Sequence, residues 1–128
     1  MSFVVCDTNI FISLFKNIQP TLDELVLIGS NNVLITSISV MELYRGMQNK
    51  GEMANMQTKL KQYNIIHINE EVSKHAIELV NKFKLSHNLQ IPDAIIGAMS
   101  VVNNIELFTY NLKDFKFIPG IKLYTVSH

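Results

Sequence analysis

The chain has 128 residues, a length typical of one domain with one core, so we expect a single domain over residues 1–128. Hydrophobic residues make up 48% and charged residues 17%, a composition that excludes a largely disordered chain. Eleven basic residues balance eleven acidic ones, so no overall charge attracts nucleic acid, and any such binding depends on a local patch.

The sequence predicts a cytoplasmic protein. No stretch approaches the roughly 20 apolar residues needed to span a bilayer, and the first residues lack the pattern of a signal peptide. The only cysteine, Cys6, excludes an internal disulfide and fits a reducing compartment. Because Cys6 lies in an apolar run, we interpret it as a core residue rather than a nucleophile.

Short apolar runs along the chain predict strands. Four of them show no alternation of polar and apolar residues, which is typical of strands covered on both faces. They span residues 3–6, 33–36, 65–68 and 107–110. A fifth run, residues 121–126, follows a connection barely long enough for a crossover, so its direction in the sheet stays open.

Helical patterns separate these runs. Residues 70–84 place apolar side chains on one helix face, with Asn69 as a plausible N-cap and acidic residues in the first turn. Pro92 suits the start of a later helix that ends at Asn103 and Asn104. Alternating strands and helices predict an α/β fold of three layers, with a mostly parallel central sheet of about five strands.

Four acidic residues stand near predicted strand ends. Asp7 ends the first strand, Glu42 follows the second within the next helix, Asp93 opens the later helix, and Asp114 follows the fourth strand. In open α/β sheets, ligands bind at the carboxyl ends of the strands. We therefore expect these carboxylates to border one edge of the sheet.

Each acidic residue also has a purely structural interpretation. Asp7 could be an N-cap, and Glu42 could form a capping box with Ser39. Asp93 could simply favour the helix dipole, and Asp114 could be an exposed turn residue.

Convergence of the four carboxylates would favour a metal. Their mutual repulsion raises their pKa values unless a cation joins them. Mg²⁺ or Mn²⁺ prefers carboxylate oxygens and retains waters, which leaves room for a phosphate oxygen and an attacking water. The four histidines are too dispersed to indicate zinc.

Four motifs together resemble the PIN-domain nucleases. These are "DTN" after the first strand, "SISVMELYRG" after the second, "IPDAIIGAMSV" at the later helix and "LFTYNLKDFKFIPGIKLY" near the end. The single-domain size resembles VapC-type toxins of bacterial toxin–antitoxin pairs. The resemblance covers nearly the whole chain, and the order of the four motifs carries it.

The resemblance implies a Mg²⁺- or Mn²⁺-dependent endoribonuclease that hydrolyses RNA phosphodiester bonds. Asp7 and Asp93 would hold the first ion, and Glu42 would bind it directly or through water and help deprotonate the attacking water. Many members have the fourth acid where this chain has Asn111, whereas others have it three residues on, here Asp114. Asp114 would then assist a second ion or a water.

Polar neighbours would orient the carboxylates or waters; they are Thr8, Asn9, Thr109 and Asn111. Phosphate contacts would come from a few cations, namely Arg45, Lys113 and Lys116, with Lys59 and Lys61 as further rim candidates. For Arg45, an ion pair with Glu42 is an equally good interpretation.

The resemblance also implies a cognate antitoxin protein, RNA as substrate and a homodimer, with no membrane. Aromatic and methionine side chains in the early helices could form a groove for the antitoxin or could be ordinary core. They are Phe11, Phe15, Tyr44, Met47, Met53 and Met56.

Two other functions remain open from the sequence. The neutral Asn111 keeps open a PIN-like protein that binds RNA or a partner without cleaving. A Mg²⁺-dependent phospho-receiver module shares the size and class, but its aspartate at the end of the third strand and its lysine after the fifth have no match here.

Overall fold

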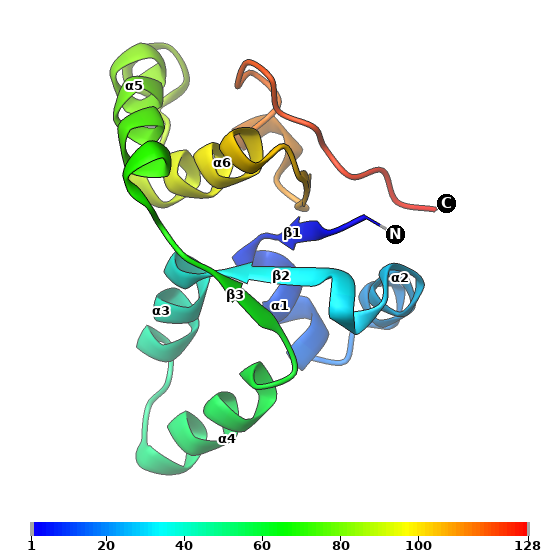
Figure 1. The fold of residues 1–128 in the computed structure, drawn as a ribbon. Coiled ribbons are helices and arrows are strands. Elements are labelled where there is room, and N and C mark those ends of the chain that lie inside the picture. The colour runs from blue at the N-terminus through cyan, green and yellow to red at the C-terminus, as the bar shows by residue number, and fades with distance from the viewer. Residues whose placement is uncertain (1, 128) are drawn as a thin grey trace.

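The computed structural model describes residues 2–127, and its centre is a four-stranded parallel sheet in the order β3-β2-β1-β4 (Figure 1). The strands are β1 (Val4–Cys6), β2 (Val33–Thr36), β3 (Asn64–Ile66) and β4 (Glu106–Phe108). Cys6 pairs with Ile35 of β2 and with Phe108 of β4. The residues that follow these three strands therefore meet at one carboxyl edge.

Helices cover both faces of the sheet, as predicted for a three-layer fold. In Figure 1 the first four helices lie on one side and the last two on the other. They are α1 (Thr8–Phe15), α2 (Gln19–Ile28), α3 (Ser37–Arg45), α4 (Lys50–Leu60), α5 (Glu70–His87) and α6 (Ile91–Asn103). Short 3-10 turns, η1 (Ser30–Asn32) and η2 (Leu112–Asp114), lie before β2 and after β4.

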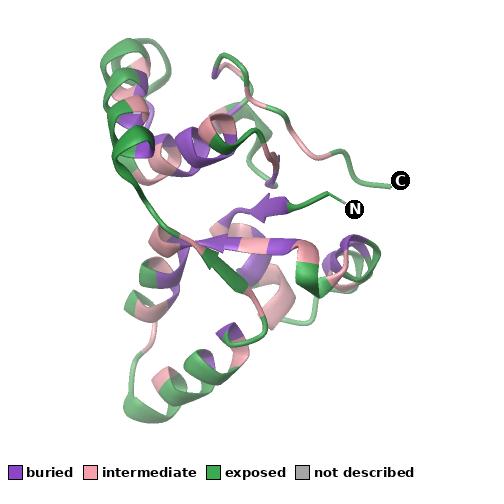
Figure 2. Ribbon diagram, in the orientation of Figure 1, coloured by how far each residue is buried: buried purple, intermediate pink, exposed green. Residues whose placement is uncertain are grey.

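The central strand β1 joins two apolar cores. Val4 and Cys6 belong to the core under α1 to α4, whereas Val5 belongs to the core under α5 and α6. Figure 2 shows the buried residues concentrated on β1, β2 and the inner faces of the helices. The lack of alternation in this strand thus reflects cover on both faces, and the interpretation of Cys6 as a core residue is confirmed by its 0% exposure.

The predicted helices are confirmed, with the expected ends. Asn69 caps α5 by accepting a hydrogen bond from the Val72 amide at 2.9 Å. Pro92 lies in the first turn of α6, and Asn104 ends that helix in the left-handed conformation. The α5 helix extends three residues beyond the predicted end, to His87, before Asn88 closes it in the same way.

The strand predictions need three corrections. The predicted fourth strand, residues 107–110, is shorter in the structure, because β4 ends at Phe108 and Tyr110 is 46% exposed. The run at residues 121–126 contributes only a parallel bridge between Leu123 and Leu107, so the sheet has four strands rather than about five. The predicted third strand shifts to Asn64–Ile66 and lies at the sheet edge, where Ile65 is exposed rather than covered on both faces. Edge strands have a neighbour on one side only, which explains the weaker cover.

Between residues 2 and 127, no helix combines the length and the apolar character needed to cross a bilayer.

Candidate active site

Asp7 lies at the carboxyl end of β1 and is only 5% exposed. Its Oδ1 accepts a hydrogen bond from the Thr8 amide at 2.7 Å, and its Oδ2 accepts one from the Thr109 hydroxyl at 2.8 Å. Asp7 is thus the N-cap of α1, as its structural interpretation predicted, and also the residue at the sheet edge. Each oxygen keeps a further lone pair for another ligand.

Glu42 approaches Asp7 through Thr8. The Thr8 hydroxyl donates to Glu42 Oε1 at 2.7 Å and lies 2.7 Å from the Ser39 hydroxyl. The capping-box interpretation is wrong, because the N-cap of α3 is Thr36, whose hydroxyl accepts from the Ser39 amide at 3.1 Å. Glu42 lies one turn further along the helix, on the side that faces the carboxyl edge.

Asp93 occupies the first turn of α6, where the helix dipole favours a negative charge, as its structural interpretation held. Burial is the main cause that raises its pKa to about 6. The charges of three other residues raise this pKa as well; they are Asp7, Asp114 and Glu42. Every charge that acts on Asp93 in this way is negative, so the four carboxylates share one electrostatic environment.

Burial also raises the pKa of Asp7. The hydrogen bonds from Thr109 and Thr8 act against this, because they stabilise the ionised form. The charges of Glu42 and Asp114 raise the pKa again. Hydrogen bonding therefore favours an ionised Asp7 in a setting that otherwise disfavours it.

Asp114 ends the 3-10 turn η2, and its side chain is partly buried. With Asp93 it lines a cavity of about 150 Å³. The Thr109 hydroxyl accepts from the Asn111 amide at 3.0 Å, and Asn9 Oδ1 accepts from the Tyr110 amide at 3.4 Å. These bonds fix the segment that leads from β4 to Asp114, although the Asn111 side chain itself is exposed.

The four carboxylates are a chemically suitable donor set for a hard divalent cation. They are oxygen donors whose negative charges help raise the pKa values of Asp7 and Asp93, and a cation would relieve this repulsion. Within residues 2–127, however, no three His, Cys, Asp or Glu side chains are arranged closely enough to hold an ion as they stand. Ion binding would therefore draw the carboxylates together.

The basic residues near the acids are exposed. Arg45 lies at the end of α3, and Lys113 and Lys116 lie on either side of Asp114 in the chain. The ion pair between Arg45 and Glu42 is not formed, because the single salt bridge within residues 2–127 joins Lys74 to Glu70 at 2.9 Å. Lys59 instead lies over the Phe15 ring, 5.1 Å from its centroid. Arg45 and the two lysines are thus free to contact a ligand.

Sequence reasoning missed several polar residues of this edge. Thr36 and Ser39 are buried and join the network through Thr8, although Ser39 had suggested only a helix cap. Thr36 is the last residue of β2, next to the edge that Asp7 and Thr109 occupy after their strands, and this position is the signal that could have identified it. His87 and Gln90 line the cavity beside Asp93 and were also missed.

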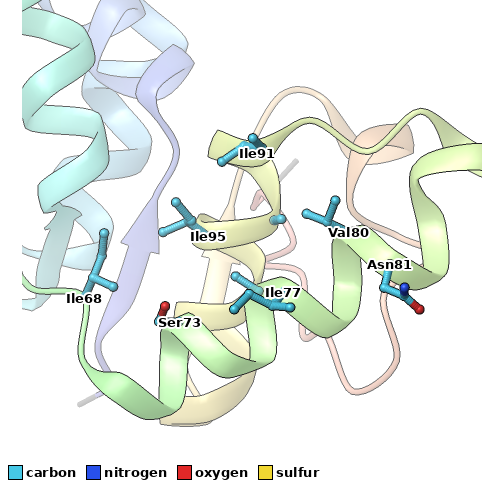
Figure 3. Close-up of a pocket in the computed structure, with 9 residues that line it drawn as sticks. Ile68, Ser73, Ile77, Val80, Asn81, Ile91 and Ile95 are labelled. Carbon is cyan, nitrogen blue, oxygen red and sulfur yellow. The ribbon is translucent and has the colours of Figure 1, made fainter.

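A larger cavity lies elsewhere, in an apolar groove of about 590 Å³ between α5 and α6. Figure 3 shows Ile77 and Val80 of α5 beside Ile91 and Ile95 of α6, with Ile68 near one end. None of the four acidic residues lines this groove. Its lining is apolar apart from Ser73 and Asn81 and contains no acidic or basic side chain, so we place the candidate active site at the carboxyl edge despite the smaller cavity there.

Comparisons with known proteins agree with this architecture. The chain belongs to the PIN domain family, whose sequence pattern it matches over residues 4–120. The predicted family is thereby confirmed, and the phospho-receiver interpretation is excluded. No curated protein matches the chain in sequence.

Several solved structures share the fold over almost the whole chain. A toxin–antitoxin complex from Klebsiella pneumoniae contains a chain that is 31% identical, with a TM-score of 0.77, covering 92% of this chain and 94% of that one. VapBC2 from Rickettsia felis, bound to a DNA fragment from its promoter, is 26% identical with a TM-score of 0.80, covering 95% and 97%. VapBC-1 from nontypeable Haemophilus influenzae is 24% identical with a TM-score of 0.82, covering 98% and 99%.

Proposed function

We propose that the protein is a Mg²⁺- or Mn²⁺-dependent endoribonuclease and the toxin of a type II toxin–antitoxin pair. The main support is the shared electrostatic environment of Asp7, Glu42, Asp93 and Asp114, in which the pKa of Asp93 rises to about 6. The family and the toxin–antitoxin neighbours add to it. A cluster that repels itself at neutral pH suits a protein that binds a divalent cation there.

Asp7 and Asp93 would hold the principal ion, with Glu42 and Asp114 beside it. A divalent ion bound here would lower the pKa of its water and neutralise charge on the phosphate oxygens. Thr8 and Thr109 fix the two oxygens of Asp7 from opposite ends of the chain. This fixes the orientation of the carboxylate before the ligand arrives.

Glu42 is the best-placed proton acceptor. Thr8 holds Oε1 at 2.7 Å, and among the described residues none donates to Oε2. Oε2 can therefore take a proton from a water that attacks the phosphate. Exposed Arg45, one turn along α3, would contact a phosphate nearby, and Lys113 and Lys116 would do so beside Asp114.

A cognate antitoxin is the proposed protein partner, since the structural neighbours are described as toxin–antitoxin complexes. The aromatic and methionine side chains of the early helices, which could form a groove for the antitoxin, differ in burial. Phe11 and Met56 are core residues. Tyr44 in α3, Met47 between α3 and α4, and Met53 in α4 are partly buried. The partly buried members, together with Phe15, remain available to an antitoxin segment.

We also propose a homodimer formed through the groove between α5 and α6. Ile77 and Ile91 both line this groove, and they are 67% and 65% exposed. The surface around the groove therefore carries protruding apolar side chains. A twofold interface needs one patch that carries both protruding side chains and a depression to receive them, and this patch has both. Burial of such apolar side chains is the main driving force of association.

Cleavage of single-stranded RNA by the purified protein tests the enzymatic proposal. We expect cleavage with Mg²⁺ or Mn²⁺, none with EDTA, and none from Asp7→Asn or Asp93→Asn although both stay folded. Removing one of several repelling carboxylates relieves repulsion, so loss of activity would not reflect loss of fold. Specific RNA binding by a parent that never cleaves would support the alternative, a PIN-like binding protein.

A further inference from the structure

The small cavity beside Asp93 and Asp114 has a second, uncharged wall. It lies between the end of α5, the start of α6 and η2, and its lining residues are His87, Asn88, Leu89, Gln90, Asp93 and Asp114. Leu89 is only 4% exposed, whereas His87, Asn88 and Gln90 are exposed. The cavity therefore joins two candidate active-site carboxylates to a wall of amide and imidazole groups.

The two amides present unused hydrogen-bonding groups. Lys84 donates to Asn88 Oδ1, and Gln90 Nε2 donates to the Asn88 backbone oxygen at 2.9 Å. These bonds hold both side chains but leave Asn88 Nδ2 and Gln90 Oε1 without a partner in the described chain. A donor and an acceptor in one small cavity match the edge of a nucleobase, which also presents donors beside acceptors.

The imidazole of His87 offers a stacking surface. It stacks on Phe117 with centroids 4.1 Å apart and an interplanar angle of 16°, and Phe83 meets it edge-on at 5.6 Å. One face of the ring is thus covered by Phe117, and the other face has no aromatic partner. Bases of single-stranded RNA stack on aromatic and histidine rings of this kind.

The size of the cavity limits the kind of ligand that it can hold. Its volume of about 150 Å³ is below the roughly 300–1,000 Å³ of sites for drug-sized ligands, so it would accept one planar group. Among the described residues no lysine or arginine lines this cavity, so its lining offers none of the cations that usually bind a phosphate. An uncharged heterocycle with hydrogen-bonding groups at its edge is compatible with the carboxylates, the two amides and the imidazole that line the cavity.

We propose that this cavity binds one nucleobase of the RNA, and that Asn88 and Gln90 select which base enters while His87 stacks on it. The proposal rests on the ribonuclease function above. Because Asp93 and Asp114 belong to both the cavity and the active site, the bound base belongs to a nucleotide next to the cleaved phosphate. Base preference at that one position is therefore set by the turn between α5 and α6.

Cleavage of a pool of random-sequence RNA, with sequencing of the product ends, tests the selection. We expect the parent to prefer one base at one position flanking the cut. Gln90→Leu and Asn88→Gly should each weaken that preference about tenfold at this position only, the size expected when a base edge loses one hydrogen-bond partner. Glycine retains the left-handed conformation of Asn88, whose φ is 52°, so the turn persists. Gln57→Leu, exposed on α4, is the matched control and should keep the parent preference.

Binding measurements test the stacking without cleavage. Fluorescence anisotropy with the Asp7→Asn protein would compare an oligoribonucleotide of the preferred sequence with the same strand made abasic at the selected position. The abasic strand should bind about tenfold more weakly, and added His87→Ala should remove this difference whereas His87→Phe should retain it.

The outcomes separate the two proposals. A parent that cleaves RNA with base preferences unaltered by Gln90→Leu and Asn88→Gly would overturn the nucleobase site and leave the ribonuclease intact. An unchanged abasic penalty in His87→Ala would remove the stacking role. A parent that cleaves no RNA would overturn both proposals.

Discussion

Thr109 donates a 2.8 Å hydrogen bond to Asp7 although 102 positions separate the two residues in the sequence. Pairing of β4 with β1 creates this contact, because Cys6 lies opposite Phe108 and the next residue of each strand reaches the same edge. The bond stabilises the ionised form of Asp7, whose pKa burial otherwise raises. Its removal therefore has a direct electrostatic consequence.

Thr109→Val should impair cleavage and move its pH dependence. Without the hydroxyl, the pKa of Asp7 rises further, so the acidic limb of the pH–rate profile should shift to higher pH. Stability should fall by about 1–3 kcal/mol, because a buried acceptor loses its partner. Rates across pH and urea unfolding measure the two effects, and Thr109→Ser, which keeps the hydroxyl, is the control. A valine variant with the parent's pH profile would show that the bond does not tune Asp7.

The raised pKa of Asp93 predicts how stability depends on pH in EDTA. Its pKa is about 6 in the folded chain against 3.8 for an ordinary aspartate, so the folded state binds more protons between these values. The free energy of unfolding should therefore fall as pH rises from about 4 to about 6. Allowing for partial exposure of Asp93, the fall should be about 1 kcal/mol.

Asp93→Asn should decline less steeply than the parent, because Asp7 alone then keeps a raised pKa, and it should exceed the parent in stability above pH 6. Urea unfolding at several pH values measures it, and Glu71→Gln, also in a first helical turn but exposed, is the matched control. If Asp93→Asn and the parent changed in parallel from pH 4 to pH 8, the shared electrostatic environment would be wrong.

The position of Asp7 shows which features of the site can be predicted from the sequence. Residues that directly follow apolar strands, such as Asp7, could be placed at the carboxyl edge because parallel pairing aligns strand ends. The apolar runs also predicted the layers, since both faces of β1 are covered. The fifth run failed because apolar character alone does not determine whether a segment pairs over its whole length or at one residue, as Leu123 does.

Contacts between side chains that are far apart in the chain could not be predicted from the sequence. Nothing in the spacing of Thr8 and Glu42 indicates their 2.7 Å hydrogen bond, which depends on how α3 packs against α1. Likewise, the stacking of His87 on Phe117 joins α5 to the segment after β4. Such pairs follow from packing, whereas the edge positions follow from strand order.

Ile77→Glu should convert the proposed homodimer into a monomer. A charge at this position cannot be buried against the partner without a large desolvation cost, so dimer affinity should fall at least about tenfold. Light scattering coupled to size exclusion measures the mass, and circular dichroism confirms the fold. Leu85→Glu places the same charge on the same helix at a residue that is 98% exposed and outside the groove, and it should stay dimeric. A dimeric Ile77→Glu protein would assign dimerisation to another surface.

Asp114 is the acid of the candidate site that lies in the turn after β4. It contributes to the raised pKa values of Asp7 and Asp93 and shares a cavity with Asp93, whereas Asn111 directs its side chain to solvent. If Asp114 assists a second ion, Asp114→Asn removes one negative charge and weakens the attraction for that cation. The rate should fall, and the Mg²⁺ concentration that gives half-maximal cleavage should rise about tenfold.

Asn111→Ala, at the exposed neighbouring position, should keep the parent's metal dependence. A titration in which Asp114→Asn overlays the parent curve would assign Asp114 to the turn alone, with at most about 0.5 kcal/mol of stability lost.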